Sequence, residues 1–218
     1  NVAPQFANPR VTEYMDSIIN YIDNLVKVGA AYVVDGEVFF DVSKDDKYGE
    51  LSKIEIENLI SGARVEENTK KKNPLDFLLW KNTDLGIKWS SPWCEGRPGW
   101  HTECCVMIDT IFKGMIDIHG GGMDLRFPHH ENEIAQAEMT HHNHLANYWI
   151  HNAMMNIKGE KMSKSLGNVI LAKDAIETYG ADLVRLTLLN APYRSIINFS
   201  DTTLADNQSI LQKLSACY

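Results

Sequence analysis

One stretch of the sequence limits the possible folds more than any other. Met115–His119 is an apolar run that leads into three glycines, a helical pattern covers His130–His141, and a second apolar run covers Tyr148–Met155. A strand, a glycine turn, a helix and a strand in this order are typical of a parallel α/β sheet. Such sheets bind their ligands at the carboxyl ends of the strands. We therefore expect an α/β fold with its chemistry directly after these strands.

The remaining elements are expected on both sides of this stretch. Apolar residues recur at steps of three and four over Val11–Val28, which predicts an amphipathic helix. Asp35-Gly36 lies between two β-runs and predicts a hairpin. The polar stretch Lys44–Asn73 ends in three consecutive lysines, and we expect it to be a surface insertion with one short helix near Ile54–Ile60. A strand is expected over Asp76–Lys81. Further helices are expected from Trp100, over Ala172–Tyr179 and Ala181–Leu189, and from Asp201 behind Ser200.

The composition is that of a globular protein and excludes a generally basic, nucleic-acid-binding coat. Hydrophobic residues make up 44% of the 218 residues and charged residues 23%, which is ordinary for a packed domain. Lys and Arg number 21 against 29 Asp and Glu, for a net charge of −8, a total that still allows a local basic stripe. No apolar run is long enough to span a membrane, and the four cysteines do not resemble a disulfide framework. We therefore expect a cytoplasmic protein with no membrane partner.

Cys104, His129 and Glu133 form the first candidate site. His129 and Glu133 are four residues apart in a helical stretch, so their side chains share one face. Cys104 would arrive from the preceding helix. A thiolate, an imidazole and a carboxylate together suit Zn²⁺. The spacing is also compatible with a buried cysteine and a helix-surface contact, and His130 competes with His129 as the imidazole.

Two further segments are candidates for nucleotide binding. Gly120-Gly121-Gly122 would let backbone N–H groups approach a nucleotide, with Asp124 accepting from a ribose hydroxyl or an amino group; a tight turn is the alternative. Lys161 and Lys164 lie three residues apart in a loop rich in Gly and Ser and can hold the charge that develops on a triphosphate. A solvated surface loop is the alternative there.

The segment Lys161-Met-Ser-Lys-Ser165 resembles the second signature of the class I aminoacyl-tRNA synthetases. Together with Gly99–Cys104, Asp117–Glu133, Asn168 and Tyr193-Arg194-Ser195, it resembles the cysteinyl-tRNA synthetase family over essentially all 218 residues. The resemblance implies ligation of L-cysteine to tRNA(Cys) in two steps. ATP, with Mg²⁺, and cysteine first give cysteinyl adenylate and pyrophosphate. The aminoacyl group then passes to the terminal ribose of the tRNA.

The resemblance also implies roles for the candidate residues. Cys104, His129 and Glu133 correspond to three of the four protein ligands of a Zn²⁺ ion. In the family this ion binds the thiolate of the substrate. Zinc–thiolate bonding would reject serine, whose hydroxyl ionises far less readily and is a harder donor. Trp100 corresponds to the tryptophan that lines the amino-acid pocket. Lys164 corresponds to the ATP-binding lysine and forms the expected catalytic pair with Lys161. Beside the nucleotide we expect Asp124, Gly121 and Gly122.

The implied fold is the second half of a Rossmann-type parallel sheet of a class I synthetase, with an α+β insertion and a following helical segment. Residues 1–30 would be a helix of the nucleotide-binding fold, and 31–92 a connective insertion. Residues 93–157 would be the second half of the catalytic domain. The signature loop and a helical segment that contacts the tRNA stem would occupy 158–218.

Departures from the family pattern predict an internal portion of a longer enzyme. The HIGH-type first signature, the first zinc cysteine and the helical region that reads the anticodon are not found in the sequence. We expect this chain alone to be inactive and the intact enzyme to be a monomer. Cys94 and Cys105 are candidate substitute ligands, although Cys94 more simply fills space. Two other functions are considered: a cysteine:glucosaminyl-inositol ligase of the same superfamily, and a non-catalytic zinc-binding fragment.

Overall fold

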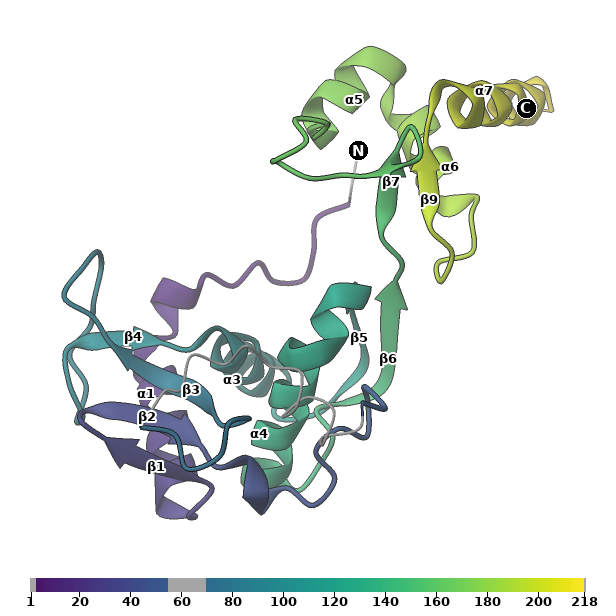
Figure 1. Ribbon diagram of the computed structural model, residues 1–218. Coiled ribbons are helices and arrows are strands. Elements are labelled where there is room, and N and C mark those ends of the chain that lie inside the picture. Colours follow the sequence, from purple (N-terminus) through teal and green to yellow (C-terminus); the bar gives the residue numbers. More distant parts are fainter. Residues whose placement is uncertain (1–2, 55–69, 218) are drawn as a thin grey trace. The chain divides into compact units, whose positions relative to one another are not determined.

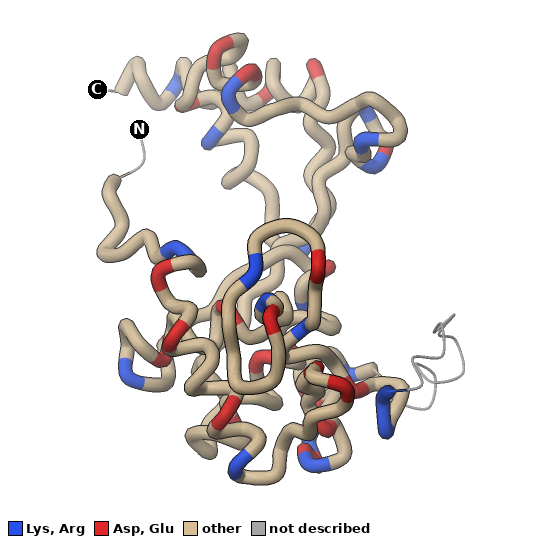
Figure 2. The backbone as a smooth tube through the Cα atoms, turned by 90° about the vertical axis from the view of Figure 1, so that its left-hand side faces the viewer, with Lys and Arg blue, Asp and Glu red and all other residues tan. Residues whose placement is uncertain are grey.

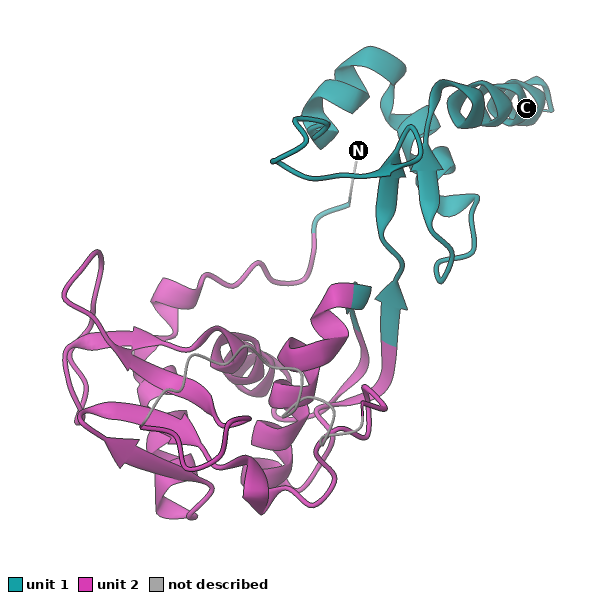
Figure 3. Cartoon of the chain, viewed as in Figure 1, with its two compact units in different colours: residues 1–4, 120–123, 150–218 teal, residues 5–119, 124–149 magenta. Residues whose placement is uncertain are grey.

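The structure is a computed structural model that describes residues 3–54 and 70–217 (Figure 1). The chain divides into two compact units (Figure 3). Unit 1 comprises Asn1–Pro4, Gly120–Met123 and Ile150–Tyr218, and unit 2 comprises Gln5–His119 and Asp124–Trp149. Each unit has a hydrophobic core of its own. The division of the sequence into four functional segments stays a prediction.

Apart from Ile54, the short helix expected near Ile54–Ile60 falls outside the described residues. Across the two described ranges, no helix is both long enough and apolar enough to pass through a membrane.

Unit 2 begins with the amphipathic helix that the sequence predicts. A 3-10 turn over Val11–Glu13 precedes α1 (Met15–Lys27). Gly29 follows the helix with a φ of +79°, a left-handed conformation that glycine adopts without steric cost. Burial of its apolar face holds α1 on the unit. The buried residues are Met15, Ile18, Tyr21, Ile22 and Leu25.

A four-stranded antiparallel sheet, in the order β1-β2-β3-β4, shares this core. β1 (Ala31–Val34) and β2 (Glu37–Phe40) form the predicted hairpin. Asp35 and Gly36 have φ values of 50° and 78°, as a two-residue turn of type I′ requires. A 3-10 turn over residues 42–44 follows. β3 (Phe77–Asn82) pairs with β2, and β4 (Gly96–Pro98) pairs with β3.

The stretch from α3 to β6 follows the predicted order of elements. α3 (Trp100–Phe112) and α4 (Glu131–His141) pack in the core of unit 2 with α1 and the sheet. β5 (Ile116–Gly122) and β6 (Ala146–Asn152) pair with each other and belong partly to each unit. Between β5 and α4 lie a 3-10 turn, residues 123–125, and a π-helical turn, Arg126–His130.

Unit 1 contains a small mixed sheet and three helices. β7 (Met155–Ile157) lies between β8 (Glu160–Lys161), which is antiparallel to it, and β9 (Ile197–Phe199), which is parallel to it. The β5–β6 pair and this short parallel pair of β7 and β9 bear out part of the predicted parallel sheet; together they are less extended than the sequence led us to expect. The three predicted helices are confirmed as α5 (Ala172–Tyr179), α6 (Ala181–Leu189) and α7 (Asp201–Ala216).

Candidate metal centre

The first turn of α3 supplies two of the candidate residues. Trp100 is the first residue of the helix, and Cys104 follows four positions later on the same face. Gly99 precedes the helix and lies directly against β3, because a Cβ at this position would be 1.9 Å from the carbonyl oxygen of Leu78. Only glycine fits there, so the start of α3 is fixed on the sheet.

The π-helical turn and α4 supply His129 and Glu133, four residues apart. The insertion holds the start of α4 in place. The Glu131 carboxylate accepts the backbone N–H groups of three residues, Gly49, Leu51 and Ser52. The Tyr48 hydroxyl donates to the side-chain oxygen of Asn132. These bonds fix the start of the helix that carries Glu133 and that directly follows the turn with His129.

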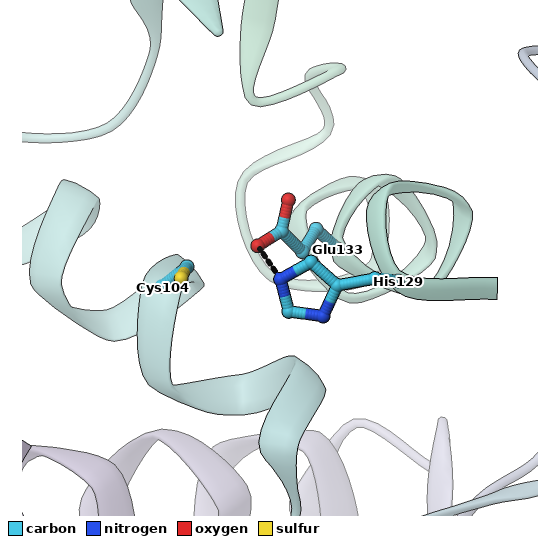
Figure 4. Close-up of side chains that lie close together, drawn as sticks. All are labelled: Cys104, His129 and Glu133. Carbon is cyan, nitrogen blue, oxygen red and sulfur yellow. Dashed lines mark ion pairs between the residues drawn. The ribbon is translucent and has the colours of Figure 1, made fainter. Parts of the chain in front are cut away.

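The structure brings Cys104, His129 and Glu133 together, as the sequence predicts. Their ligand atoms all lie within 4.8 Å of one another. Figure 4 shows the thiol approaching from α3 and the other two side chains from the helix opposite. His129 Nε2 and Glu133 Oε1 form an ion pair at 3.2 Å. Both residues are buried and Cys104 is half-buried, so the group lies largely out of water.

A second group shares the same carboxylate. His119, His130 and Glu133 also have ligand atoms within 4.8 Å of one another. His119 Nε2 lies 2.7 Å from Glu133 Oε2, and its ring also lies close to His130 and Trp149. His119 was not among the residues predicted from the sequence. Its place at the carboxyl end of the apolar run before the glycines, where ligand-binding residues are expected, was the available signal.

The electrostatics of Glu133 fit a bound cation. Burial raises the pKa of its carboxyl, but the neighbouring imidazoles of His119 and His129 outweigh burial and lower the pKa to about 2. The carboxylate is therefore ionised in the interior. Its Oε1 is buried, with His129 Nε2 at 3.2 Å but no hydrogen bond of good geometry from any described residue, whereas Oε2 is bonded to His119. A carboxylate oxygen without a hydrogen bond, next to a thiol and an imidazole, is what a metal ligand requires.

Cys104 needs a cation if it is to ionise. Burial, and then the charge of Glu133, raise the pKa of its thiol to about 12. A bound metal would lower the pKa of this thiol again, because a thiol that coordinates a metal is deprotonated. Cys105 is fully buried, with Sγ against the carbonyl oxygens of His101 and Glu133. Neither Cys94 nor Cys105 belongs to a possible metal-binding group of the described residues.

Aromatic rings enclose one side of His129. Trp100 stacks on its ring with centroids 4.5 Å apart and planes 25° from parallel. His101 Nδ1 lies 2.9 Å from His129 Nδ1. Burial, and then the proximity of His129, lower the pKa of His101 to about 4, so His101 is neutral at neutral pH. Since Trp100 itself is 58% exposed, one face of its indole is available to a ligand.

Gly121, Gly122 and Asp124 do not form the tight turn that was the alternative interpretation. The two glycines are the last residues of β5, and Asp124 is exposed in the 3-10 turn that follows. Gly121 and Gly122 are half-buried, without the positive φ of a turn glycine. Their contact with a nucleotide remains a proposal.

The loop with Lys161 and Lys164 belongs to unit 1. Both lysines are exposed, and neither forms an ion pair with any of the described residues. Asn168 closes the loop: its side-chain oxygen accepts the Ser163 backbone N–H at 2.8 Å, and its side-chain NH₂ donates to the Lys161 carbonyl at 3.1 Å. The loop thus has a defined shape with two unneutralised cations.

Comparison with solved structures agrees with this architecture. Mycobacterium tuberculosis methionyl-tRNA synthetase in complex with methionyl-adenylate gives a TM-score of 0.64 over 92% of this chain and 50% of that chain, at 16% identity. A putative arginyl-tRNA synthetase from Campylobacter jejuni gives 0.55 over 91% of this chain and 35% of that chain, at 18% identity. At such identities the likeness shows the fold alone.

Sequence relatives are much closer. Proteins named Cysteine--tRNA ligase from Sulfurihydrogenibium sp. (strain YO3AOP1) and Shouchella clausii (strain KSM-K16) are 50% and 52% identical over 214 and 215 residues. Each match covers 98% of this chain but only 44% and 46% of the relative, so the chain spans a little under half the length of these relatives. Residues 1–209 match the family described as "tRNA synthetases class I (C) catalytic domain". The chain therefore belongs to the class I (C) tRNA synthetase catalytic-domain family.

Proposed function

We propose that this chain serves the ligation of L-cysteine to tRNA(Cys) through cysteinyl adenylate. The observation that carries the proposal is the convergence of Cys104, His129 and Glu133 in a member of this family. It is supported by curated relatives about 50% identical that are named Cysteine--tRNA ligase. The substrates are then L-cysteine, ATP with Mg²⁺, and tRNA(Cys), and the protein acts in the cytoplasm, where aminoacyl-tRNA is used.

Cys104, His129 and Glu133 would hold a Zn²⁺ ion. When bound, zinc would supply a Lewis acid for the thiolate of the substrate cysteine. These residues are three of the four protein ligands that the family resemblance implies, and the substrate thiolate would bind in addition to them, since catalytic zinc can expand its coordination to admit a substrate. Zinc would select cysteine against serine because a thiolate is a softer metal ligand than a hydroxyl. A purely steric pocket would separate the two amino acids by only ~1–3 kcal/mol.

The residues around the ligands would orient them and the substrate. His119 holds one oxygen of Glu133 and leaves the other for the metal. Trp100, stacked on His129, would offer its exposed indole face to the bound cysteine. His101, neutral at neutral pH, adds no positive charge to the centre.

The signature loop would act on ATP. Lys161 and Lys164 are exposed on a loop fixed by Asn168, and two ammonium groups can stabilise the charge that develops as pyrophosphate leaves. Gly121, Gly122 and Asp124, at the end of β5, are proposed to contact the nucleotide, in accord with ligand binding at the carboxyl ends of strands.

Cobalt(II) in place of zinc tests the metal centre on the purified chain. Thiolate-to-cobalt charge-transfer absorption reports how many thiolates are bound. We expect L-cysteine to increase this band and L-serine to leave it unchanged. Cys104→Ser should remove the band of the substrate-free protein, whereas Cys94→Ser, the control, should retain it. An equal response to serine and cysteine would contradict the proposed selection.

Cysteine-dependent exchange of labelled pyrophosphate into ATP tests the activity. We expect none from the chain alone. The second protein to test is a chimera, in which this chain replaces the matching segment of the Aquifex aeolicus relative, 50% identical over 214 residues. We expect the chimera to show the exchange. Lys164→Ala should abolish the exchange and Lys213→Ala, on exposed α7, should not. A folded, zinc-binding chimera without exchange would refute adenylate formation. Transfer of cysteine to glucosaminyl-inositol rather than to tRNA(Cys) would identify the other ligase.

A further inference from the structure

The carboxylate of Glu133 belongs to two groups of candidate metal ligands. The first group is Cys104, His129 and Glu133, and the second group is His119, His130 and Glu133. Oε1 of the carboxylate lies 3.2 Å from His129 Nε2, and Oε2 lies 2.7 Å from His119 Nε2. Each oxygen of this one side chain therefore faces a different group.

The neighbours of Glu133 distinguish it from two other deeply buried carboxylates. Acidic residues are interspersed with Lys and Arg along the chain (Figure 2), so an acid alone does not indicate a metal site. The buried carboxylates of Asp76 and Glu131 accept backbone N–H groups. The carboxylate of Glu133 is fully buried beside two imidazoles instead. An imidazole nitrogen can bind a metal ion in place of a proton, which a backbone amide in a hydrogen bond does not do.

The second group has the donor atoms of a transition-metal site. Two imidazole nitrogens and one carboxylate oxygen, with a position left open, hold Zn²⁺ in some enzymes and Fe²⁺ in others. The three residues of this group include no thiol, whereas the first group contains Cys104. The second group should therefore bind Zn²⁺, Co²⁺ or Ni²⁺ without a bond to sulfur, so that the two groups can be told apart by spectroscopy.

Separate elements hold the side chains of the second group in place. His119 is on β5, His130 is the last residue of the π-helical turn, and Glu133 is in the first turn of α4. The ring of Trp149, on β6, lies 4.7 Å from the ring of His119 and 5.0 Å from that of His130, measured between centroids. The indole confines both imidazoles, so little conformational entropy would be lost when they bind an ion.

A cavity in unit 2 gives an ion access to the second group. The cavity has a volume of about 400 Å³, and both His119 and Cys104 line it. Its other lining residues are mainly apolar and come from α3 and from the segment before α1. The side chain of His119 is 15% exposed, whereas His130 and Glu133 are almost fully buried. An ion would therefore enter past His119 and reach ligands that are shielded from water.

We propose that His119, His130 and Glu133 bind a second divalent transition-metal ion. Glu133 bridges the two ions with one oxygen on each, an arrangement in which ions lie about 3.5–4 Å apart in known two-metal sites. The second ion binds more weakly than the first, because two dications on one carboxylate repel each other. The inference goes beyond the proposed function, in which only the ion of the first group takes part.

Titration of the metal-free chain with cobalt(II) tests the proposal. The chain carries no affinity tag, and visible absorption follows the titration. We expect two equivalents of Co²⁺ per chain, the first with thiolate-to-cobalt charge-transfer absorption and the second with d–d absorption only. Equilibrium dialysis measures the stoichiometry independently. Saturation at one equivalent, with charge-transfer absorption, overturns the proposal without the use of any variant.

Two indoles report which group each ion occupies. Trp100 stacks on His129 with centroids 4.5 Å apart. Trp149 lies beside His119 and His130. Because paramagnetic Co²⁺ quenches tryptophan fluorescence at short range, Trp100→Phe should remove most of the quenching by the first equivalent and Trp149→Phe most of that by the second. Undiminished quenching by the second equivalent in Trp149→Phe would place this ion elsewhere and overturns the proposal.

Variants of the ligands separate the two sites. His130→Gln should weaken binding of the second equivalent at least about 100-fold, since a direct ligand matters more than an outer partner, and should leave the charge-transfer band of the first. Cys104→Ser should remove the band and keep the ion of the second group. Circular dichroism checks folding, and His119→Gln, at a partly exposed position, replaces His130→Gln if the latter does not fold. Retention of the second equivalent in the folded variant overturns the proposal.

The surface run His141-His142-Asn143-His144 is the competing place for a second ion. The double variant His142→Ala/His144→Ala removes two exposed imidazoles from this run and none from the second group. We expect it to bind both equivalents of Co²⁺ with unchanged absorption. Loss of the second equivalent in this variant overturns the proposal, because the ion would then belong to the surface run.

Discussion

His119 and Glu133 form a 2.7 Å contact between Nε2 and Oε2 across 14 positions of sequence. This contact takes up one carboxylate oxygen, while Oε1 is buried without a hydrogen bond from the described residues and lies beside His129 and Cys104. An imidazole that holds the outer oxygen of a ligating carboxylate fixes its orientation. In the proposed metal centre His119 would therefore be a positioning residue, or a direct ligand of the second group that shares Glu133.

Replacement of His119 tests these two roles. If His119 positions Glu133, His119→Ala should lower zinc affinity about 10- to 100-fold, the usual cost of losing such a partner, and His119→Gln should restore part of it through an amide hydrogen bond. Competition with a chromophoric chelator measures the affinity, and His142→Ala, at an exposed position, serves as the control. Unchanged affinity in His119→Ala would rule out both roles.

Trp100 should contribute to cysteine binding and not to metal binding. Its ring stacks on His129 and exposes its other face, and a sulfur atom against an aromatic ring contributes about 0.3–1.5 kcal/mol. Trp100→Ala should therefore weaken L-cysteine binding several-fold to about tenfold and leave zinc content unchanged, while Trp100→Phe should retain most of the affinity. Calorimetric titration of the zinc-loaded protein with cysteine measures this. Loss of zinc in Trp100→Ala would place the side chain in the metal centre instead.

The local features of the fold were predictable from short stretches of sequence. Asp35-Gly36 adopts the two positive φ values of its turn, and the Ser200 side chain caps α7 by accepting the Thr203 N–H. Each depends on residues within a few positions of one another, so local chemistry determines it.

Features that depend on distant contacts were predicted less well. Cys104, His129 and Glu133 were correctly grouped, and the resemblance to a known family supported the grouping. His119 was missed because its contact with Glu133 depends on how β5 packs on α4, which no periodicity encodes. The extended parallel sheet was expected from element order and from the family resemblance. β5 and β6 of the stretch on which the prediction was based do pair with each other, but element order does not determine how far a sheet extends, and β7 and β9 form a separate parallel pair.

Gly99 should be among the positions of unit 2 least tolerant of substitution. A Cβ at this position would lie 1.9 Å from the Leu78 carbonyl oxygen, which is backbone and cannot move aside. Gly99→Ala should therefore lower the free energy of unfolding by at least about 2 kcal/mol and shift the start of α3. Gly120→Ala is the comparison, since its Cβ would meet only the Ile150 carbonyl oxygen at 3.8 Å, and it should be close to neutral. Urea unfolding followed by tryptophan fluorescence measures both, and equal stability of the two variants would contradict the packing argument.

Asn168 should control the order of the signature loop through two separable hydrogen bonds. Its side-chain oxygen accepts the Ser163 N–H and its NH₂ donates to the Lys161 carbonyl. Asn168→Asp keeps the acceptor and loses the donor, whereas Asn168→Ala loses both. Amide hydrogen exchange at Ser163 should therefore accelerate strongly in Asn168→Ala and much less in Asn168→Asp, since a bond worth about 1 kcal/mol changes protection about fivefold. Asn198→Ala is the matched control, because Asn198 accepts the Gly159 N–H, outside the loop. If Ser163 exchanged equally fast in all three variants, Asn168 would not hold the loop, and the lysines would be positioned by ATP alone.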